Sequence, residues 1–252
     1  MTIGEMIASG GFGLLAGLMI GCAGIGGVIL VPALTYLAGV PIRHAIAAAM
    51  MAYIPAGAVG TAVYAREGSI CWSMALWLGV GAMPGGWLGA RAGAVVPPFV
   101  IEIVIAVMTL GSGCYALATR AAVGREQDRL AGPALAGIGT VTGFLSAMTG
   151  TGGPLVLVPI LVSLRLPLLA SVGLSQAIQA PIAILATISN VGRGNTDYAL
   201  AGCLALGLTA GSWTGARLAH RLPRAVLKRI IALILIATGV LIAAKLAMAL
   251  AA

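Results

Sequence analysis

The chain has 252 residues, of which 60% are hydrophobic and 8% are charged, and its mean hydropathy is +1.09. This composition provides too little polar surface to cover a soluble globule of this size, which predicts an integral membrane protein. The net charge of +8 is spread over short connections rather than gathered in a basic domain, so it does not indicate nucleic-acid binding.

Glycines, prolines and polar residues divide the chain into apolar segments. In chain order they cover residues 10–38, 42–65, 70–92, 98–119, 132–163, 167–190, 196–218 and 224–248. Helices are expected, because backbone groups in hydrocarbon must be hydrogen-bonded within their own segment and the alternation typical of a β-barrel is missing. Segments two, three and four of each half are long enough for one crossing at about 1.5 Å per residue. The sequence therefore predicts an all-α polytopic membrane protein with a single membrane domain over residues 1–252.

The second half of the chain repeats the first at a constant offset of 126 residues. Rare or structure-breaking residues recur at this offset: Pro41 and Pro167, Pro55 and Pro181, Gly68 and Gly194, Pro97 and Pro223, and the blocks 85–91 and 211–217. We therefore divide the chain into repeat one (10–119), a linker (120–131) and repeat two (132–248). Duplicated halves in a membrane protein are typical of transporters whose substrate binds between them.

The first segment of each repeat contains a glycine cluster with a proline after it, at 24–27 with Pro32 and at 150–153 with Pro154. Glycine lowers helix stability by about 1 kcal/mol and proline by about 3 kcal/mol, so the helix should break there. The segment is then either a kinked full crossing or a re-entrant hairpin of two short helices.

The distribution of Lys and Arg over the connections separates these alternatives. If all segments cross fully, six of the 14 Lys and Arg residues lie on one side of the membrane and eight on the other. So even a distribution does not predict the orientation of the chain. Re-entrant hairpins leave Arg43, Arg91, Arg193 and Lys245 on the side of the termini and the other ten of the 14 opposite. This bias predicts two inverted repeats, with both termini external and the 120–131 linker cytoplasmic.

In the hairpin arrangement the two glycine tips meet near the bilayer midplane, each at the start of a returning half-helix. Unpaired N–H groups and the positive ends of two helix dipoles then face one point, where glycine lets the backbone approach a ligand. The alternative is that these glycines only permit tight helix crossing. The predicted substrate-binding residues are Ala23, Gly24, Gly26, Gly27, Met50, Tyr53, Thr149, Gly150, Thr151, Gly152, Gly153, Ser175, Gln176 and Gln179.

Polar side chains, among them Ser146, gather only around the second tip. Ser175 and Gln179 are four residues apart and share a helix face, whereas Ala49 and Tyr53 stand 126 residues earlier. A site with polar side chains on one side and apolar or aromatic ones on the other suits a ligand with an anionic head and a small organic body. The alternative is that these side chains hydrogen-bond neighbouring helices.

Arg91 and Arg217 end the two Gly-x-Trp-x-Gly-Ala-Arg blocks. We expect them to reach lipid headgroups, with gating or substrate attraction as the alternative role. The glycines at 81, 85 and 89 and at 207, 211 and 215 predict close helix packing, with Trp87 and Trp213 as packing anchors.

No constellation for catalysis, metal binding or a cofactor is found in the sequence. Glu102 is the only acid well inside a predicted crossing, and we expect an interfacial carboxylate there, the alternative being a carrier of a coupling proton. His44 and His220 lie near segment ends, and the four cysteines lack CxxC or Cys/His spacing. We therefore expect no enzyme activity, no metal and no cofactor.

The run from Gly17 to Pro32, GLMIGCAGIGGVILVP, and its second copy from Gly143 to Pro159 resemble the sulfite exporter TauE/SafE family. The resemblance covers essentially the whole chain in length, duplication and glycine placement. It implies a permease of the inner (cytoplasmic) membrane that moves sulfite, sulfoacetate or related organosulfonate anions, often outward, and it suggests a homodimer. The family often has a third consecutive glycine where this chain has Val28.

The sequence thus predicts a secondary transporter, an exporter of small sulfur-containing anions, with the anion and membrane lipid as its partners. An anion channel built on the same tips is one alternative, and its flux would not saturate or support counterflow. A non-transporting membrane scaffold is another, and no anion would stabilise it.

Overall fold

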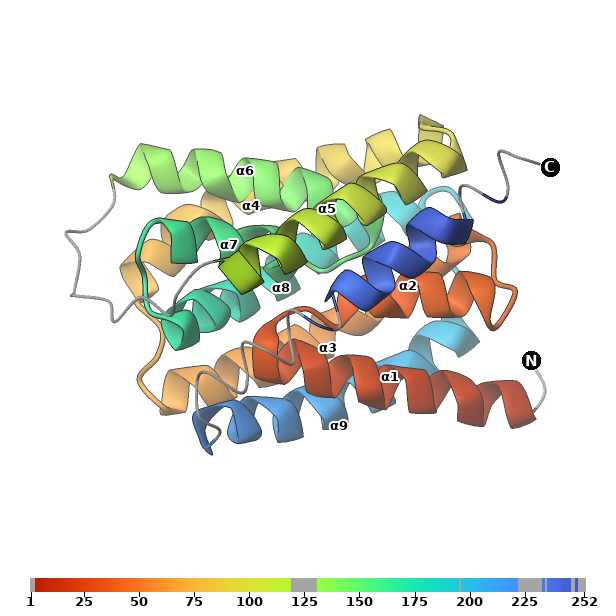
Figure 1. Ribbon diagram of the computed structural model, residues 1–252, viewed down its shortest axis with the longest axis horizontal. Coiled ribbons are helices and arrows are strands. Elements are labelled where there is room, and N and C mark those ends of the chain that lie inside the picture. Colours follow the sequence, from red (N-terminus) through yellow and green to blue (C-terminus); the bar gives the residue numbers. More distant parts are fainter. Residues whose placement is uncertain are drawn as a thin grey trace.

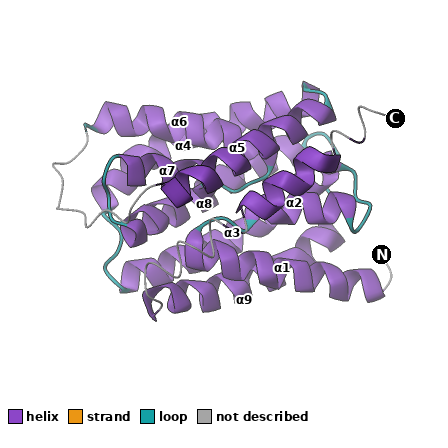
Figure 2. Cartoon of the chain, in the orientation of Figure 1, coloured by secondary structure: helices purple, strands orange, loops and turns teal. Residues whose placement is uncertain are grey.

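The computed structural model describes residues 3–118, 131–194, 196–221, 233, 235–245 and 248, a part of the chain that holds helices and no strand (Figures 1 and 2). Repeat one forms α1 (Ile3–Ala23), α2 (Gly27–Tyr36), α3 (Ile42–Arg66), α4 (Trp72–Val95) and α5 (Pro98–Ala118). Repeat two forms α6 (Gly132–Thr149), α7 (Pro154–Ser163), α8 (Leu168–Val191) and α9 (Tyr198–Arg221). A further helical stretch is Leu235–Lys245. The predicted all-α fold is confirmed, whereas the 120–131 linker, apart from its last residue, lies outside the described residues.

Helices in the two repeats begin and end at residues that are 126 positions apart, as the duplication in the sequence predicts. α3 and α8 begin 126 residues apart, and α4 and α9 match at both ends with 24 residues each. The predicted breaks are also present, since α1 ends before Gly24 with φ 76° and α6 ends before Gly150 with φ 75°. Left-handed backbone of this kind favours glycine, which explains why glycine stands at both positions.

The interrupted segments form hairpins, because α1 and α3 run in the same direction. Both lie parallel to α9, as ordered contacts show: Gly17 with Leu208, Gly21 with Ser212, Ala56 with Ser212, and Tyr64 with His220. The short helix α2 must therefore turn back before α3 begins (Figure 1). In repeat two α6 and α8 both run parallel to α4, so α7 turns back in the same way.

Two helix pairs pack backbone against backbone through glycine. In α4, a Cβ added at Gly81, Gly85 or Gly89 would overlap a carbonyl oxygen of α6, and in α9 the same holds for Gly207, Gly211 and Gly215 against α1. These two interfaces are related by the 126-residue offset. The predicted close-packing stripes are confirmed, and they hold the two segments that carry the glycine tips.

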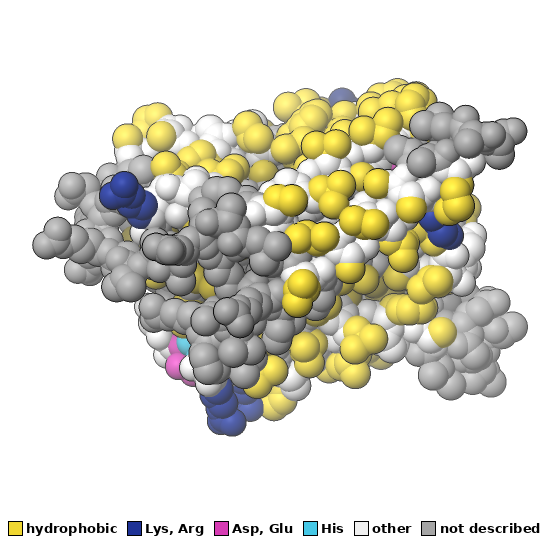
Figure 3. Space-filling model, viewed as in Figure 1, with side chains coloured by type: hydrophobic (Ala, Val, Ile, Leu, Met, Phe, Trp, Pro, Cys, Tyr) yellow, Lys and Arg dark blue, Asp and Glu magenta, His cyan; other side chains and the backbone are white. Residues whose placement is uncertain are grey.

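The outer surface is that of a protein embedded in lipid. α3, α8 and α9 are each long and apolar enough to cross a membrane, and the described chain contains shorter apolar helices besides. Hydrophobic side chains cover much of the face in Figure 3, and its Lys and Arg side chains lie at the margins of the view. The protein is a multi-pass membrane protein.

Candidate functional site

The tips of the two hairpins meet halfway along the long helices. A Cβ added at Gly24 would lie 2.6 Å from Cβ of Pro154, and one added at Gly27 would overlap the carbonyl oxygen of Thr151. The tips are thus in direct contact between α3 and α8, beside Tyr53 and Gln179, which are close to the midpoints of those helices. The glycines allow this contact because a side chain would force the tips apart.

Several backbone N–H groups at the tips have no acceptor among the described residues. In tip two the N–H groups of Gly150 and Thr151 donate to the carbonyl of Ser146, at 2.8 and 3.2 Å, whereas those of Gly152 and Gly153 donate to none. The backbone of Gly152 and Gly153 has φ of 80° and 104°, which turns it away from the end of α6 and into the start of α7. Free N–H groups at a helix start attract negative charge.

The side chains next to tip two are buried and lack partners as well. Gln179 has 0% exposure, and neither its Nε2 nor its Oε1 has a hydrogen-bond partner. Its Nε2 lies 3.3 Å from the position of a Cβ on Gly152, and the unpartnered Oγ of Ser146 lies 3.9 Å from that on Gly153. Each unsatisfied buried group costs about 1–3 kcal/mol, so this group of unpartnered polar atoms makes tip two the candidate site.

Tyr53 stands between the two tips. Its hydroxyl donates to the carbonyl oxygen of Gly150 at 3.1 Å, and its ring lies 3.2 Å from the position of a Cβ on Gly152. Tyr53 is the repeat mate of Gln179, so the pair places a phenol on one side of the tips and an amide on the other. The sequence predicts an asymmetric site at this place, and the role of the pair in binding stays a prediction.

Other predicted residues are occupied by contacts within the protein. Nε2 of Gln176 donates to the carbonyl of Ile20 at 2.8 Å and ties α8 to α1, while its Oε1 has no partner. The hydroxyl of Ser175 donates back to Val172 of its own helix at 2.7 Å, and that of Thr149 lies 3.0 Å from that of Thr151. These four side chains are therefore less available to a ligand than Gln179.

The remaining predicted substrate-binding residues surround this contact without adding a polar group. Ala23 and Met50 are buried and apolar, and Gly26 packs against Ala16 and Ile20 of α1 rather than against the other tip. All fourteen predicted residues are buried. The tips are in contact and buried in this conformation.

Two further polar side chains, outside the predicted site, are fully buried on α6 and α9. Thr142 is fully buried one turn before Ser146 on α6, and its Oγ1 has no partner. Ser212 of α9 is also fully buried and donates to the carbonyl of Ala56 at 3.1 Å. The spacing of Thr142 and Ser146 by four residues was the available signal, because it places both on one face of a helix.

Arg91 and Arg217 lie on the outer surface. The guanidinium of each is stacked on the tryptophan four residues earlier, 4.0 Å above the ring of Trp87 and 3.9 Å above that of Trp213. The two tryptophans are 37% and 43% exposed, so the prediction that they anchor packing was wrong. The stacking supports a position among headgroups, and the gating role stays a prediction.

Comparisons with known proteins find relatives that are named as membrane transporters. The chain is 26% identical over 236 residues to "Probable membrane transporter protein YdhB" of Bacillus subtilis (strain 168), covering 90% of this chain and 96% of that protein. It is also 26% identical over 249 residues to a "Probable membrane transporter protein" of Xylella fastidiosa (strain Temecula1 / ATCC 700964), covering 95% of each. No solved structure matches the chain significantly. The family description "Sulfite exporter TauE/SafE" matches residues 10–242, and the protein therefore belongs to the sulfite exporter TauE/SafE family of membrane transporters.

Proposed function

We propose that the protein is a secondary transporter that exports small sulfur-containing anions, such as sulfite or sulfoacetate, bound between the two tips. The observation that carries this proposal is the set of unpartnered donors around Gly152 and Gly153, with the amide of Gln179 beside them. The family description, which names sulfite, supports the choice of sulfur oxyanions.

The chemistry of the tips favours an anion over a cation. The free backbone groups are N–H donors at the starts of α2 and α7, where the helix dipoles are positive. The described residues contain no group of three or more His, Cys, Asp or Glu side chains that could hold a metal ion. The close approach of the tips favours a ligand of a few heavy atoms, because each added atom would have to push two packed helix pairs apart.

Alternating access would follow from the relation between the repeats. α3 and its repeat mate α8 pack antiparallel, since Gly57 lies against Gln179 whereas Gly60 lies against Gln176. This opposite course supports the inverted insertion predicted from charge, with the tips as the fixed site between two rocking halves. In this proposal the protein lies in the cytoplasmic membrane with both termini external.

Anion binding should be visible as stabilisation of the purified protein. We expect sulfite or sulfoacetate to raise the unfolding temperature more than acetate, sulfate or chloride at matched ionic strength. A ligand present at 100 times its Kd stabilises the folded state by about 2.7 kcal/mol. Differential scanning fluorimetry in detergent measures this, and equal responses to all five anions would contradict a sulfur-selective site.

The orientation of the protein makes a second prediction. Residue 127 lies in the predicted linker, so in Gln127→Cys a membrane-impermeant maleimide should label the added thiol only after the cells are permeabilised. The parent chain, with its cysteines at 22, 71, 114 and 203, gives the background labelling. Labelling of position 127 in intact cells would place the linker outside and reverse the proposed direction of the repeats.

A further inference from the structure

The two tips differ in how closely each packs against the helix that leads into it. In tip one, residues 24–27, a Cβ added at Gly26 would overlap the carbonyl oxygen of Ala16 and lie 2.9 Å from Cγ1 of Ile20, both in α1. In tip two, residues 150–153, the repeat mate of Gly26 is Gly152. None of the three atoms nearest to a Cβ on Gly152 belongs to α6. Tip one is therefore pressed onto α1, whereas tip two is less tightly packed on α6.

The space beside Gly153 is bordered by α6 and is not filled. Among the described residues, a Cβ added at Gly153 would have two atoms within 4 Å, Cδ1 of Ile182 at 3.4 Å and Oγ of Ser146 at 3.9 Å. Both are ordinary van der Waals distances. A group of about methyl size thus fits next to Gly153, with the hydroxyl of Ser146 on its α6 side.

Two hydroxyl groups on this face of α6 have no partner. Thr142 and Ser146 are four residues apart, so their side chains share a helix face at positions about 6 Å apart along the axis. Both are fully buried, and the Oγ atoms of both lack a hydrogen-bond partner among the described residues. Thr140 and Thr149 of the same helix instead donate to the carbonyl four residues earlier, at 3.0 and 2.7 Å. Thr142 and Ser146 therefore keep O–H donors that their own helix does not use.

The fold does not require hydroxyl groups at these two positions. The repeat mates of Thr142 and Ser146 are Ala16 and Ile20, which are buried and pack against tip one. A buried donor without an acceptor destabilises the folded state, so a ligand that accepts from it accounts for its presence better than packing does. α6 and α7 pack against each other and carry no charged side chain, so these hydroxyls supply the donors on this side of tip two.

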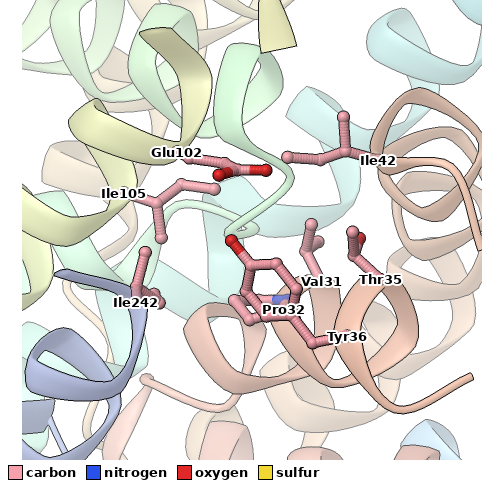
Figure 4. A pocket seen from close by; sticks show the side chains of 8 residues that line it. All are labelled: Val31, Pro32, Thr35, Tyr36, Ile42, Glu102, Ile105 and Ile242. Atoms are coloured by element: carbon pink, nitrogen blue, oxygen red, sulfur yellow. The ribbon is translucent and has the colours of Figure 1, made fainter. Parts of the chain in front are cut away.

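Two other hollows in the described chain do not suit an additional acid group of the ligand. One has a volume of about 10 Å³, room for roughly one water molecule, and is bordered by the acid Glu102 beside the second half of α2 (Figure 4). The other has a volume of about 570 Å³ and lies between α3 and α9. Its lining is apolar apart from Thr209, and it includes Trp213 of the outer surface.

We propose that Thr142 and Ser146 form a second subsite, which binds the second acceptor group of an organic anion that carries two such groups. The first group of the anion accepts from the N–H donors at Gly152 and Gly153, and the second accepts from the two hydroxyls along α6. Sulfoacetate has this form, because one methylene joins its carboxylate to its sulfonate, whereas sulfite has a single acid group. The subsite rests on the proposed transport function, since it extends the same binding site.

Thr142→Val tests the subsite, because it removes the hydroxyl and nearly keeps the shape of the side chain. The ligand pair is sulfoacetate and ethanesulfonate, which has a methyl group in place of the carboxylate. We expect the Kd of sulfoacetate to rise about 10- to 150-fold, since a hydrogen bond to a charged group is lost. The Kd of ethanesulfonate should stay unchanged. Isothermal titration calorimetry of the full-length protein in detergent measures both at matched ionic strength.

Thr140→Val is the matched control, because Thr140 lies two residues earlier on α6 and its hydroxyl is bonded to the carbonyl of Ala136. It should leave the preference for sulfoacetate over ethanesulfonate as in the parent. Thr142→Ser keeps the hydroxyl and should keep this preference as well. Equal weakening of both ligands in Thr142→Val would indicate a packing role, and an unchanged preference would show that the hydroxyl does not contact the anion. Either result would overturn the subsite.

The outcomes for the parent protein separate this proposal from the proposed function. Equal affinity for sulfoacetate and ethanesulfonate would overturn the second subsite and leave an anion transporter with a single binding position. Binding of neither ligand would contradict the proposed substrate class, and the subsite would fall with it.

The unfolding temperature without ligand tests the free hydroxyl independently of any substrate. Thr142→Val should raise it, because a buried donor without an acceptor is removed, whereas Thr140→Val should lower it, because a hydrogen bond is lost. A lower unfolding temperature in Thr142→Val would mean that the hydroxyl is bonded within the protein, which would overturn the subsite. If Thr142→Val does not fold, Ser146→Ala provides the second test, and it too should weaken the binding of sulfoacetate.

Discussion

Replacing Gln179 by Leu is expected to stabilise the ligand-free protein and to weaken anion binding at the same time. Both amide atoms of Gln179 are buried without partners, so an apolar side chain of similar size should remove a penalty of about 1–3 kcal/mol. The same amide is the donor nearest to Gly152. Its loss should therefore weaken binding by about 1–3 kcal/mol, which is roughly 5- to 150-fold in Kd.

Thermal unfolding with and without sulfite or sulfoacetate measures both effects in one series. The variant should start from a higher unfolding temperature and show a smaller rise with ligand. Ser175→Ala is the matched control, because Ser175 lies one turn earlier on the same helix and its hydroxyl is bonded to Val172. If Gln179→Leu kept the full ligand response, the amide would not contact the anion, and a response lost equally in Ser175→Ala would indicate a general disturbance of α8.

Gln179 can be recognised as a candidate binding residue from the sequence alone. An amide in the middle of a membrane helix is costly unless it has a partner, and the repeat mate Tyr53 shows that the fold does not require one there. The sequence could not show that Ser175, on the same face, bonds back to its own helix. A spacing of four residues shows that two side chains share a helix face, but it does not show which acceptor a hydroxyl on that face bonds to.

The helices were predictable because the duplication doubles each boundary signal. A proline or glycine in one repeat has a mate in the other, so α3 and α8, or α4 and α9, could each be placed twice. The tryptophans of the two blocks were misassigned for a physical reason. In a membrane protein the lipid face and the packed face are both apolar, so periodicity alone cannot tell which of them Trp87 occupies. The arginine four residues later was the missed signal for the outer face.

Glycine packing sets the position of tip two, and we expect Gly81→Ala to disrupt it. A Cβ at Gly81 would overlap the carbonyl oxygen of Ala136, which belongs to helix backbone and cannot move aside. Overpacking of this kind costs about 1–3 kcal/mol, which lowers the unfolding temperature of a chain of this size by roughly 2–4 °C per kcal/mol. α6 carries Gly150 at its end, so its displacement should also reduce anion binding.

Gly79→Ala provides the comparison within the same helix, because a Cβ at Gly79 would meet nothing within 4 Å. Alanine is favoured over glycine in a helix by about 0.8–1 kcal/mol, so this variant should keep or slightly raise the unfolding temperature. In repeat two, Gly207→Ala should lower the unfolding temperature, because a Cβ at Gly207 would overlap the carbonyl of Gly10. Gly202→Ala should not lower it, because a Cβ at Gly202 would meet nothing within 4 Å. Equal unfolding temperatures within both pairs would mean that α4 and α6, and α9 and α1, can separate without loss. The tips would then need some other support to stay closed against each other.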